Sequence, residues 1–127
     1  MKTVSLTLSV IGLAVATSAF ATEKPVLNVY TYDSFASKYG PASQLEANFE
    51  KVCHCDLRFL PFDNGVTMLN RVRLESKKTK ADVVVGIDNF TQTEAEKSGL
   101  FAANELSLQD TALPITWQSH TFYPYDY

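Results

Sequence analysis

The sequence predicts an α/β fold built on an open parallel sheet. Three segments rich in β-branched and aromatic residues, which are typical of strands, begin at Pro25, Asp56 and Ala81. A stretch with helical spacing of apolar residues follows each of them. Strands and helices that alternate in this way form right-handed crossovers, which place the strands parallel in one sheet.

The first expected strand covers residues 25–32, where a continuous apolar run is typical of a strand buried on both faces. A helix is expected over residues 41–52, because Leu45, Phe49 and Val52 then share one face. Pro41 is tolerated in the first turn of such a helix, since its missing N–H has no intrahelical partner there.

The second strand is expected over residues 56–62, and a helix over residues 66–76 follows it. In that helix Met68, Leu69 and Val72 are apolar and spaced by one, three and four residues. This spacing predicts a helix that packs one face against the sheet.

The third strand is expected over residues 81–87. A third helix then begins near Thr91 and ends at Gly99, because glycine favours the left-handed conformation just after a helix. Residues 104–116 are expected to form a loop, and a short aromatic strand is expected after it.

The first 21 residues have the features of a secretory signal peptide. Lys2 precedes an apolar run that is shorter than the ~20 residues of a membrane span, and small residues follow up to Ala21. We expect cleavage after Ala21, with a buried N-terminal helix as the alternative. Residues 22–127 would then form one exported α/β domain.

The net charge of −3 is spread along the chain, which argues against nucleic acid and anionic membranes as partners. The aromatic-rich end, from Thr116 to Tyr127, lacks a polar tail. We therefore expect the chain to be a truncated product or a gene fragment.

Short polar residues follow each expected strand: Asp33 the first, Asp63 and Asn64-Gly65 the second, and Asp88 the third. The carboxyl ends of parallel strands meet at one edge of the sheet, where ligands bind. These oxygens could accept from a cation or an amino group, and the first amides of each helix could bind an anion. Helix capping is the competing interpretation, since Asp and Asn are preferred N-caps.

Aromatic residues close in sequence to this edge could form a wall for a flat cationic ring, a contact that contributes about 0.5 to 2 kcal/mol. They are Tyr30, Tyr32, Phe35, Tyr39 and Phe62. Filling of the core is the alternative role for these side chains.

Cys53-His54-Cys55 permits a disulfide in an oxidising compartment, because residues two apart in a strand face the same way. Free thiols and a zinc half-site are the alternatives. Zinc normally has four ligands, and His120 is the only other histidine. The sequence lacks the common nucleophile, phosphate-loop and zinc-protease motifs, so we expect neither an enzyme, a cofactor nor a metal.

Several motifs together resemble the bacterial periplasmic thiamine-binding proteins, in the same order. They are Val29–Phe35, Cys53-x-Cys55, Asp63–Val66 with Leu69–Arg71, Ala81–Val84, Gly86-x-Asp88-Asn89, Gly99–Phe101 and Phe122-x-Pro124-x-Asp126-Tyr127. That family is the substrate-binding component of ABC importers for thiamine and its phosphate esters. Its fold, the type II periplasmic binding protein, has two α/β lobes that close on the ligand about a hinge.

The resemblance implies that residues 22–127 are the N-terminal lobe and its run into the hinge, with the second lobe missing. It implies a periplasmic protein that passes thiamine or its phosphate esters to an inner-membrane permease, and we expect a monomer. Asn64 stands where the family has Asp before Gly65, with Asp63 one place earlier. Tyr32 carries over as a residue facing the ligand's ring.

Asparagine can accept from an amino group but adds no charge attraction to a cation. Most of the family's ligand contacts also come from the missing lobe, so we expect weak or absent thiamine binding by this chain alone. The alternatives are a binding protein of the same architecture for iron or a polyamine, and a small secreted redox or hydrolytic enzyme.

Overall fold

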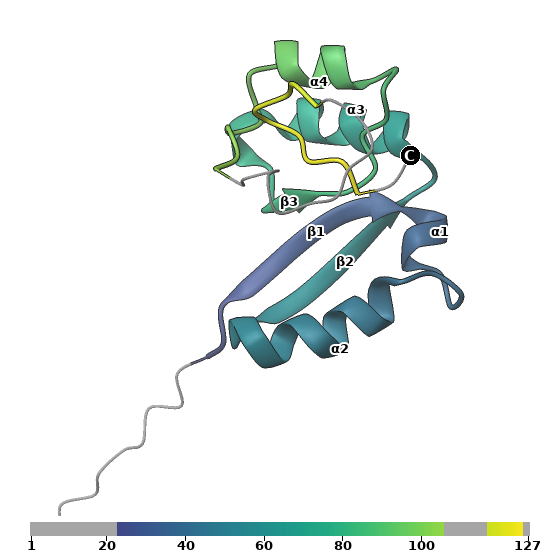
Figure 1. The fold of residues 1–127 in the computed structure, drawn as a ribbon, viewed down its shortest axis with the longest axis vertical. Coiled ribbons are helices and arrows are strands. Elements are labelled where there is room, and N and C mark those ends of the chain that lie inside the picture. Colours follow the sequence, from purple (N-terminus) through teal and green to yellow (C-terminus); the bar gives the residue numbers. More distant parts are fainter. Residues whose placement is uncertain (1–22, 106–116, 126–127) are drawn as a thin grey trace, which may run out of the picture.

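The computed structural model describes residues 23–105 and 117–125. It contains a three-stranded parallel sheet in the order β2-β1-β3 (Figure 1). The strands are β1 (Val26–Tyr32), β2 (Asp56–Phe62) and β3 (Val83–Val84). The α/β class and the parallel sheet are confirmed, whereas the signal peptide and its cleavage site lie outside the described residues.

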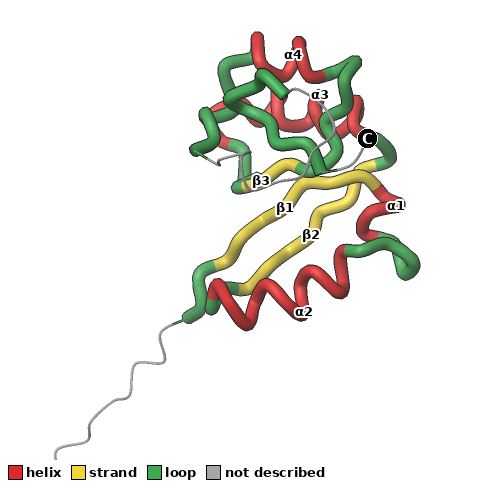
Figure 2. Tube along the Cα trace, viewed as in Figure 1, coloured by secondary structure: helices red, strands yellow, loops and turns green. Residues whose placement is uncertain are grey.

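Helices cover the two faces of the sheet (Figure 2). On one face lie α1 (Asp33–Ala36) and α2 (Ala42–Cys53), which contact β2. On the other face α3 (Gly65–Glu75) contacts β1 and β2, and the short 3-10 helix η1 (Ser76–Lys78) continues it. The last helix, α4 (Gln92–Lys97), lies beyond α3 in Figure 1.

The larger part of the core lies between the sheet and α3. Tyr30 from β1 is buried there against Met68 and Val72 of α3, as the helical spacing of the apolar residues predicted. Side chains alternate across a strand, so Val29 and Thr31 belong to the opposite face. That face also buries Phe35, Ala42 and Leu57.

A carboxylate joins the end of α3 to the middle of β1. Glu75 accepts hydrogen bonds from Tyr30 Oη at 3.0 Å, from Thr79 Oγ1 at 3.0 Å and from Arg71 Nε at 2.6 Å. Burial acts to raise the pKa of Glu75, but the hydrogen bonds from Arg71, Thr79 and Tyr30 outweigh it and lower the pKa below its usual value. Burial, and then the hydrogen bond to Glu75, raise the pKa of Tyr30.

The structure differs from the prediction at α1 and at β3. The four-residue α1 was not predicted, because a single turn has no measurable periodicity. Instead of residues 81–87, β3 covers only Val83–Val84. It ends early because Gly86 has φ +110°, outside the extended region.

The expected aromatic strand near the end of the sequence is wrong for the described residues 117–125, which contain no strand. Ser119 Oγ accepts hydrogen bonds from the amides of Thr121 and Phe122, and Trp117 Nε1 donates to the carbonyl of Phe122 at 2.8 Å. These local bonds fold the segment back on itself and prevent extended pairing.

The apolar face of α2 is only partly covered. Leu45 and Phe49 each keep 46% of their surface exposed, and Val52 keeps 77%. Only Ala42 of this helix is buried. The predicted stripe therefore exists, but the described part of the chain does not bury it.

Cys53 and Cys55 form a disulfide. They do not lie in one strand, as the sequence argument assumed: Cys53 is the last residue of α2, and His54 follows in the left-handed conformation with φ 54°. The disulfide thus spans the turn between α2 and β2. No helix within residues 23–105 and 117–125 is long and apolar enough to cross a membrane.

Candidate functional site

The parallel register brings the ends of the strands to one level. Tyr32 at the end of β1 lies opposite Phe62 at the end of β2, and Tyr30 lies opposite Val84 of β3. Asp33 follows Tyr32 and Asp63 follows Phe62, so both aspartates lie where their strands leave the sheet, at the same edge. We call this edge, formed by residues 32–34, 63–65 and 86–89, the rim.

Two glycines allow the loops of the rim to approach closely. A Cβ atom at Gly65 would lie 2.5 Å from the carbonyl oxygen of Gly86, so a side chain there would push the loops apart. A Cβ atom at Gly86 would collide with the ring of Tyr32. The carboxyl ends of the three strands therefore lie close together at one edge of the sheet, as the parallel arrangement predicted.

Two of the predicted site residues cap helices or turns. Asn64 Oδ1 accepts from the amide of Thr67 at 2.9 Å, which is the N-cap bond of α3. Asp88 Oδ1 accepts from Thr91 Oγ1 at 2.7 Å and from the amides of Thr91 and Phe90 at 2.8 and 3.1 Å. The hydrogen bonds from Thr91, first from its side chain, lower the pKa of Asp88, so its carboxylate stays charged at neutral pH.

The other two carboxylates of the rim, Asp33 and Asp63, are exposed. Asp33 is in the first turn of α1 and Asp63 precedes the N-cap of α3. Their negative charge is therefore available at the surface beside Tyr32. This arrangement suits a cation, because opposite charges attract and the rim holds no basic side chain.

The predicted aromatic wall is divided between the rim and the core. Tyr30 and Phe62 pack together within the core, with ring centroids 5.0 Å apart. Phe35 is buried against Tyr32, with centroids 5.7 Å apart. Tyr39 is 91% exposed, so it is not part of an aromatic wall with the other four rings.

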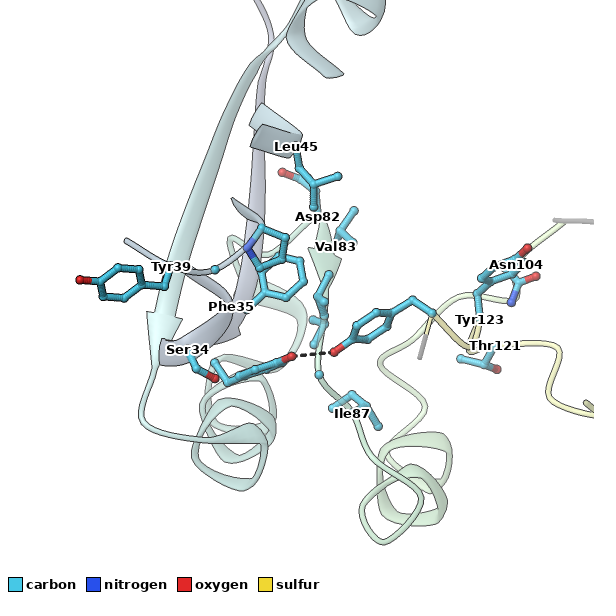
Figure 3. Close-up of a pocket in the computed structure, with 17 residues that line it drawn as sticks. Ser34, Phe35, Tyr39, Leu45, Asp82, Val83, Ile87, Asn104, Thr121 and Tyr123 are labelled. Carbon is cyan, nitrogen blue, oxygen red and sulfur yellow. Dashed lines mark hydrogen bonds between the residues drawn. The ribbon is translucent and has the colours of Figure 1, made fainter. Parts of the chain in front are cut away.

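A pocket of about 470 Å³ opens at the rim, and Tyr32, Asp88 and Asn89 belong to its lining. The other wall comes from the far end of the chain, with Trp117 and Tyr125 among its residues. Tyr32 Oη and Tyr125 Oη are hydrogen-bonded at 2.8 Å, and the dashed line in Figure 3 marks this bond. Asp33, Asp63, Asn64 and Gly65 do not line this pocket.

The sequence argument did not assign the wall residues Trp117, Tyr123 and Tyr125 to the site. The sequence did contain an indication of such a wall, because the segment from residue 117 onward is dense in aromatic residues. That density alone could not show that a segment more than 80 residues away contacts β1, as the hydrogen bond between Tyr32 and Tyr125 does.

The described residues contain no group of three or more His, Cys, Asp or Glu side chains that could hold a metal ion. Cys53 and Cys55 are bonded to each other and lie at the amino-terminal end of β2, opposite the rim. The cysteine pair and the rim are therefore separate features.

Sequence similarity to known proteins extends along the whole chain. This chain is 45% identical over 128 residues to the thiamine-binding periplasmic protein of Haemophilus influenzae, a match that covers 100% of this chain and 38% of the relative. Its relatives are periplasmic thiamine-binding proteins. That of Escherichia coli is 46% identical over 104 residues, which cover 82% of this chain and 32% of the relative. That of Brucella suis is 44% identical over 119 residues, with coverage of 94% and 34%.

A solved structure described as a periplasmic thiamin binding protein has the same fold, with a TM-score of 0.77 and 43% sequence identity. The match covers 91% of this chain and 35% of that one. No family model matches the sequence. This chain thus spans about a third of the length of the thiamine-binding relatives that it matches.

Proposed function

We propose that this chain forms one lobe of a periplasmic receptor that binds thiamine or its phosphate esters. The observation that supports this most strongly is the 44–46% identity to thiamine-binding periplasmic proteins along nearly the whole chain. The convergence of three strand ends at the rim adds a physical reason, because such an edge is where open α/β sheets bind ligands.

In this proposal Tyr32 stacks against a ring of the ligand, and the carboxylates of Asp33, Asp63 and Asp88 attract the positive charge of the thiazolium ring. Asn64 and Gly65 form the turn beneath the ligand. The amino-terminal end of α3, which begins at Gly65, favours an anion, so it suits the phosphate of a thiamine ester.

The same proposal includes where the protein acts and which membrane protein receives the ligand. Residues 1–21 direct export and are removed, so that the receptor acts in the periplasm. An inner-membrane ABC permease receives the ligand. The receptor binds without catalysing a reaction, as the names of its relatives support. Those names do not favour iron, a polyamine or an enzymatic reaction.

A chimera tests the proposed function. Residues of this chain replace the matched part of the Haemophilus influenzae relative, and thiamine is titrated calorimetrically with spermidine as competitor. We expect the folded chimera to bind thiamine and spermidine to leave that binding unchanged. A chimera with a normal circular dichroism spectrum that prefers spermidine, or that binds no thiamine, would contradict the proposal.

A single substitution in the chimera tests the role of the rim. Asn64→Asp keeps the N-cap oxygen and adds a negative charge, so we expect thiamine affinity to rise roughly two- to fivefold, the effect of an exposed charge pair. Asn70→Asp, on the exposed surface of α3, is the matched control and is expected to leave the affinity unchanged.

A further inference from the structure

The disulfide between Cys53 and Cys55 lies where α2 ends and β2 begins, at the end of the sheet remote from α1 (Figure 1). These are the two cysteines of the sequence, so any exchange of this bond needs a thiol from outside the chain. Cys53 is half-buried and His54 is exposed, whereas Cys55 keeps only 6% of its surface exposed. A thiol that approaches from solvent therefore reaches the sulfur of Cys53 first.

The fold protects this bond only weakly against reduction. A disulfide stabilises a fold mainly by restricting the unfolded chain, and a bond between residues two apart restricts that chain little. The two effects are linked, so the folded structure hinders reduction only as much as the disulfide stabilises the fold. Exposed disulfides that gain little from the fold are the ones that exchange readily with thiols.

The junction of α2 and β2 also has hydrogen bonds that do not involve sulfur. The carbonyl oxygen of Glu50 accepts from the amide of His54 at 3.2 Å, and its Oε1 accepts from the amide of Leu57 at 2.9 Å. The Cα atoms of the two cysteines are 5.2 Å apart, and these bonds keep them close after reduction. The disulfide can therefore form again without any rearrangement of the backbone.

We propose that the Cys53–Cys55 disulfide is a site of reversible thiol–disulfide exchange with a low-molecular-weight thiol of the glutathione type. A thiolate of that compound attacks Cys53 Sγ and forms a mixed disulfide, and Cys55 leaves as a thiolate that takes a proton from water. A second thiolate then attacks the sulfur that came from the first and releases Cys53. Two external thiols are oxidised to one disulfide, and their two electrons reduce the cysteine pair to two thiols.

One contact favours the second step. The amide of Cys55 donates a hydrogen bond to Cys53 Sγ at 3.1 Å. A hydrogen bond donated to sulfur stabilises a thiolate more than a neutral thiol, so it favours the release of Cys53 from the mixed disulfide.

Reduction of the folded chain by glutathione tests the inference. The complete chain is equilibrated with mixtures of reduced and oxidised glutathione, free thiols are alkylated, and mass spectrometry counts them. A peptide of residues 50–58 is the reference, since it has both cysteines without the fold. We expect the chain to be less readily reduced than the peptide by no more than about thirtyfold, which corresponds to about 2 kcal/mol of protection, and to keep its circular dichroism spectrum.

Two single variants test which sulfur the external thiol reaches. Cys55→Ser leaves the half-buried Cys53 thiol, and the matched variant Cys53→Ser leaves the buried Cys55 thiol. We expect oxidised glutathione to form a mixed disulfide with Cys55→Ser at least about tenfold faster than with Cys53→Ser, because reaction needs access to the sulfur. Circular dichroism checks that both variants fold.

Three results would overturn the inference: the chain resists reduction more than about thirtyfold better than the peptide, reduction unfolds the chain, or folded Cys53→Ser reacts as fast as Cys55→Ser. The first two are measured on the unmodified chain, so they decide the inference even where a variant does not fold. These measurements do not involve thiamine, so their outcome is separate from that of the proposed function.

Discussion

At the scale of single residues, the polar groups of the rim serve two purposes at once. Asn64 and Asp88 begin a helix and a turn, and both lie at the rim, the edge at which we propose the ligand binds. The capping interpretation and the site interpretation are therefore compatible. The sequence could place these residues after strands, but only the structure shows which backbone amides they accept from.

Loss of the Glu75 carboxylate should cost stability, because three hydrogen bonds end on it. Glu75→Gln removes the charge from three hydrogen bonds, and we expect the free energy of unfolding to fall by about 1 to 3 kcal/mol at neutral pH, measured by urea denaturation. Glu94→Gln is the control, because Glu94 is 67% exposed and its ion pair with Arg73 spans 3.6 Å.

The effect of Glu75 should depend on pH. Because its pKa is lowered in the folded protein, its stabilisation is fully present above the ordinary glutamate pKa of about 4.3 and is lost as pH falls below that value. The difference in unfolding free energy between the unmodified chain and Glu75→Gln should therefore shrink below about pH 4. A difference that stays constant down to strongly acidic pH would contradict this.

At the scale of elements, apolar periodicity predicted the parts that pack against each other. β1, β2 and α3 lie within one residue of their predicted bounds, because burial against neighbours fixes their patterns. The sequence could not predict that Gly86 would end β3 after Val84, nor that Ser119 would bend the final segment. Those outcomes depend on single backbone angles and local hydrogen bonds, which periodicity does not report.

The junction of α2 and β2 should survive loss of its disulfide. The bond closes a very short loop, so we expect replacement of both Cys53 and Cys55 by Ser to lower the free energy of unfolding by less than about 2 kcal/mol. Glu50 Oε1 also accepts a hydrogen bond from the amide of Leu57 at 2.9 Å, and this bond connects α2 to β2 independently of the disulfide.

Urea denaturation of the double variant and of the unmodified chain, each with and without reductant, measures this. The reductant should affect only the unmodified chain, and the two reduced proteins should unfold at similar urea concentrations. Complete unfolding on reduction would show that the disulfide, and not the packing of Cys55 and Leu57, holds the junction.

At the scale of the whole molecule, parallel crossovers explain why residues distant in sequence lie at one edge of the sheet. Residues 33, 63–65 and 86–88 gather at one edge because all three strands run in the same direction and end at nearly the same level. This part of the site could be predicted from the order of strands and helices. The contribution of Tyr125 could not, because it depends on where a segment without regular structure returns to the sheet.

The proposed function predicts that this chain alone binds thiamine weakly. The rim would contact only part of a bound ring, so the rest of the ring would stay exposed to water and gain little from burial. Binding that is weak can still be located, because backbone amide resonances in an NMR spectrum report contact at high ligand concentration.

The most direct test of the account is therefore a titration of the isotope-labelled chain with thiamine up to about millimolar concentration, the range expected for one-sided contact. We predict that the amide resonances that shift belong to the rim, at Tyr32 and Asp33, at Asn64 and Gly65, and at Gly86 to Asp88. Shifts confined to the opposite end of the sheet, around Cys53 and Cys55, would contradict a thiamine site at the rim.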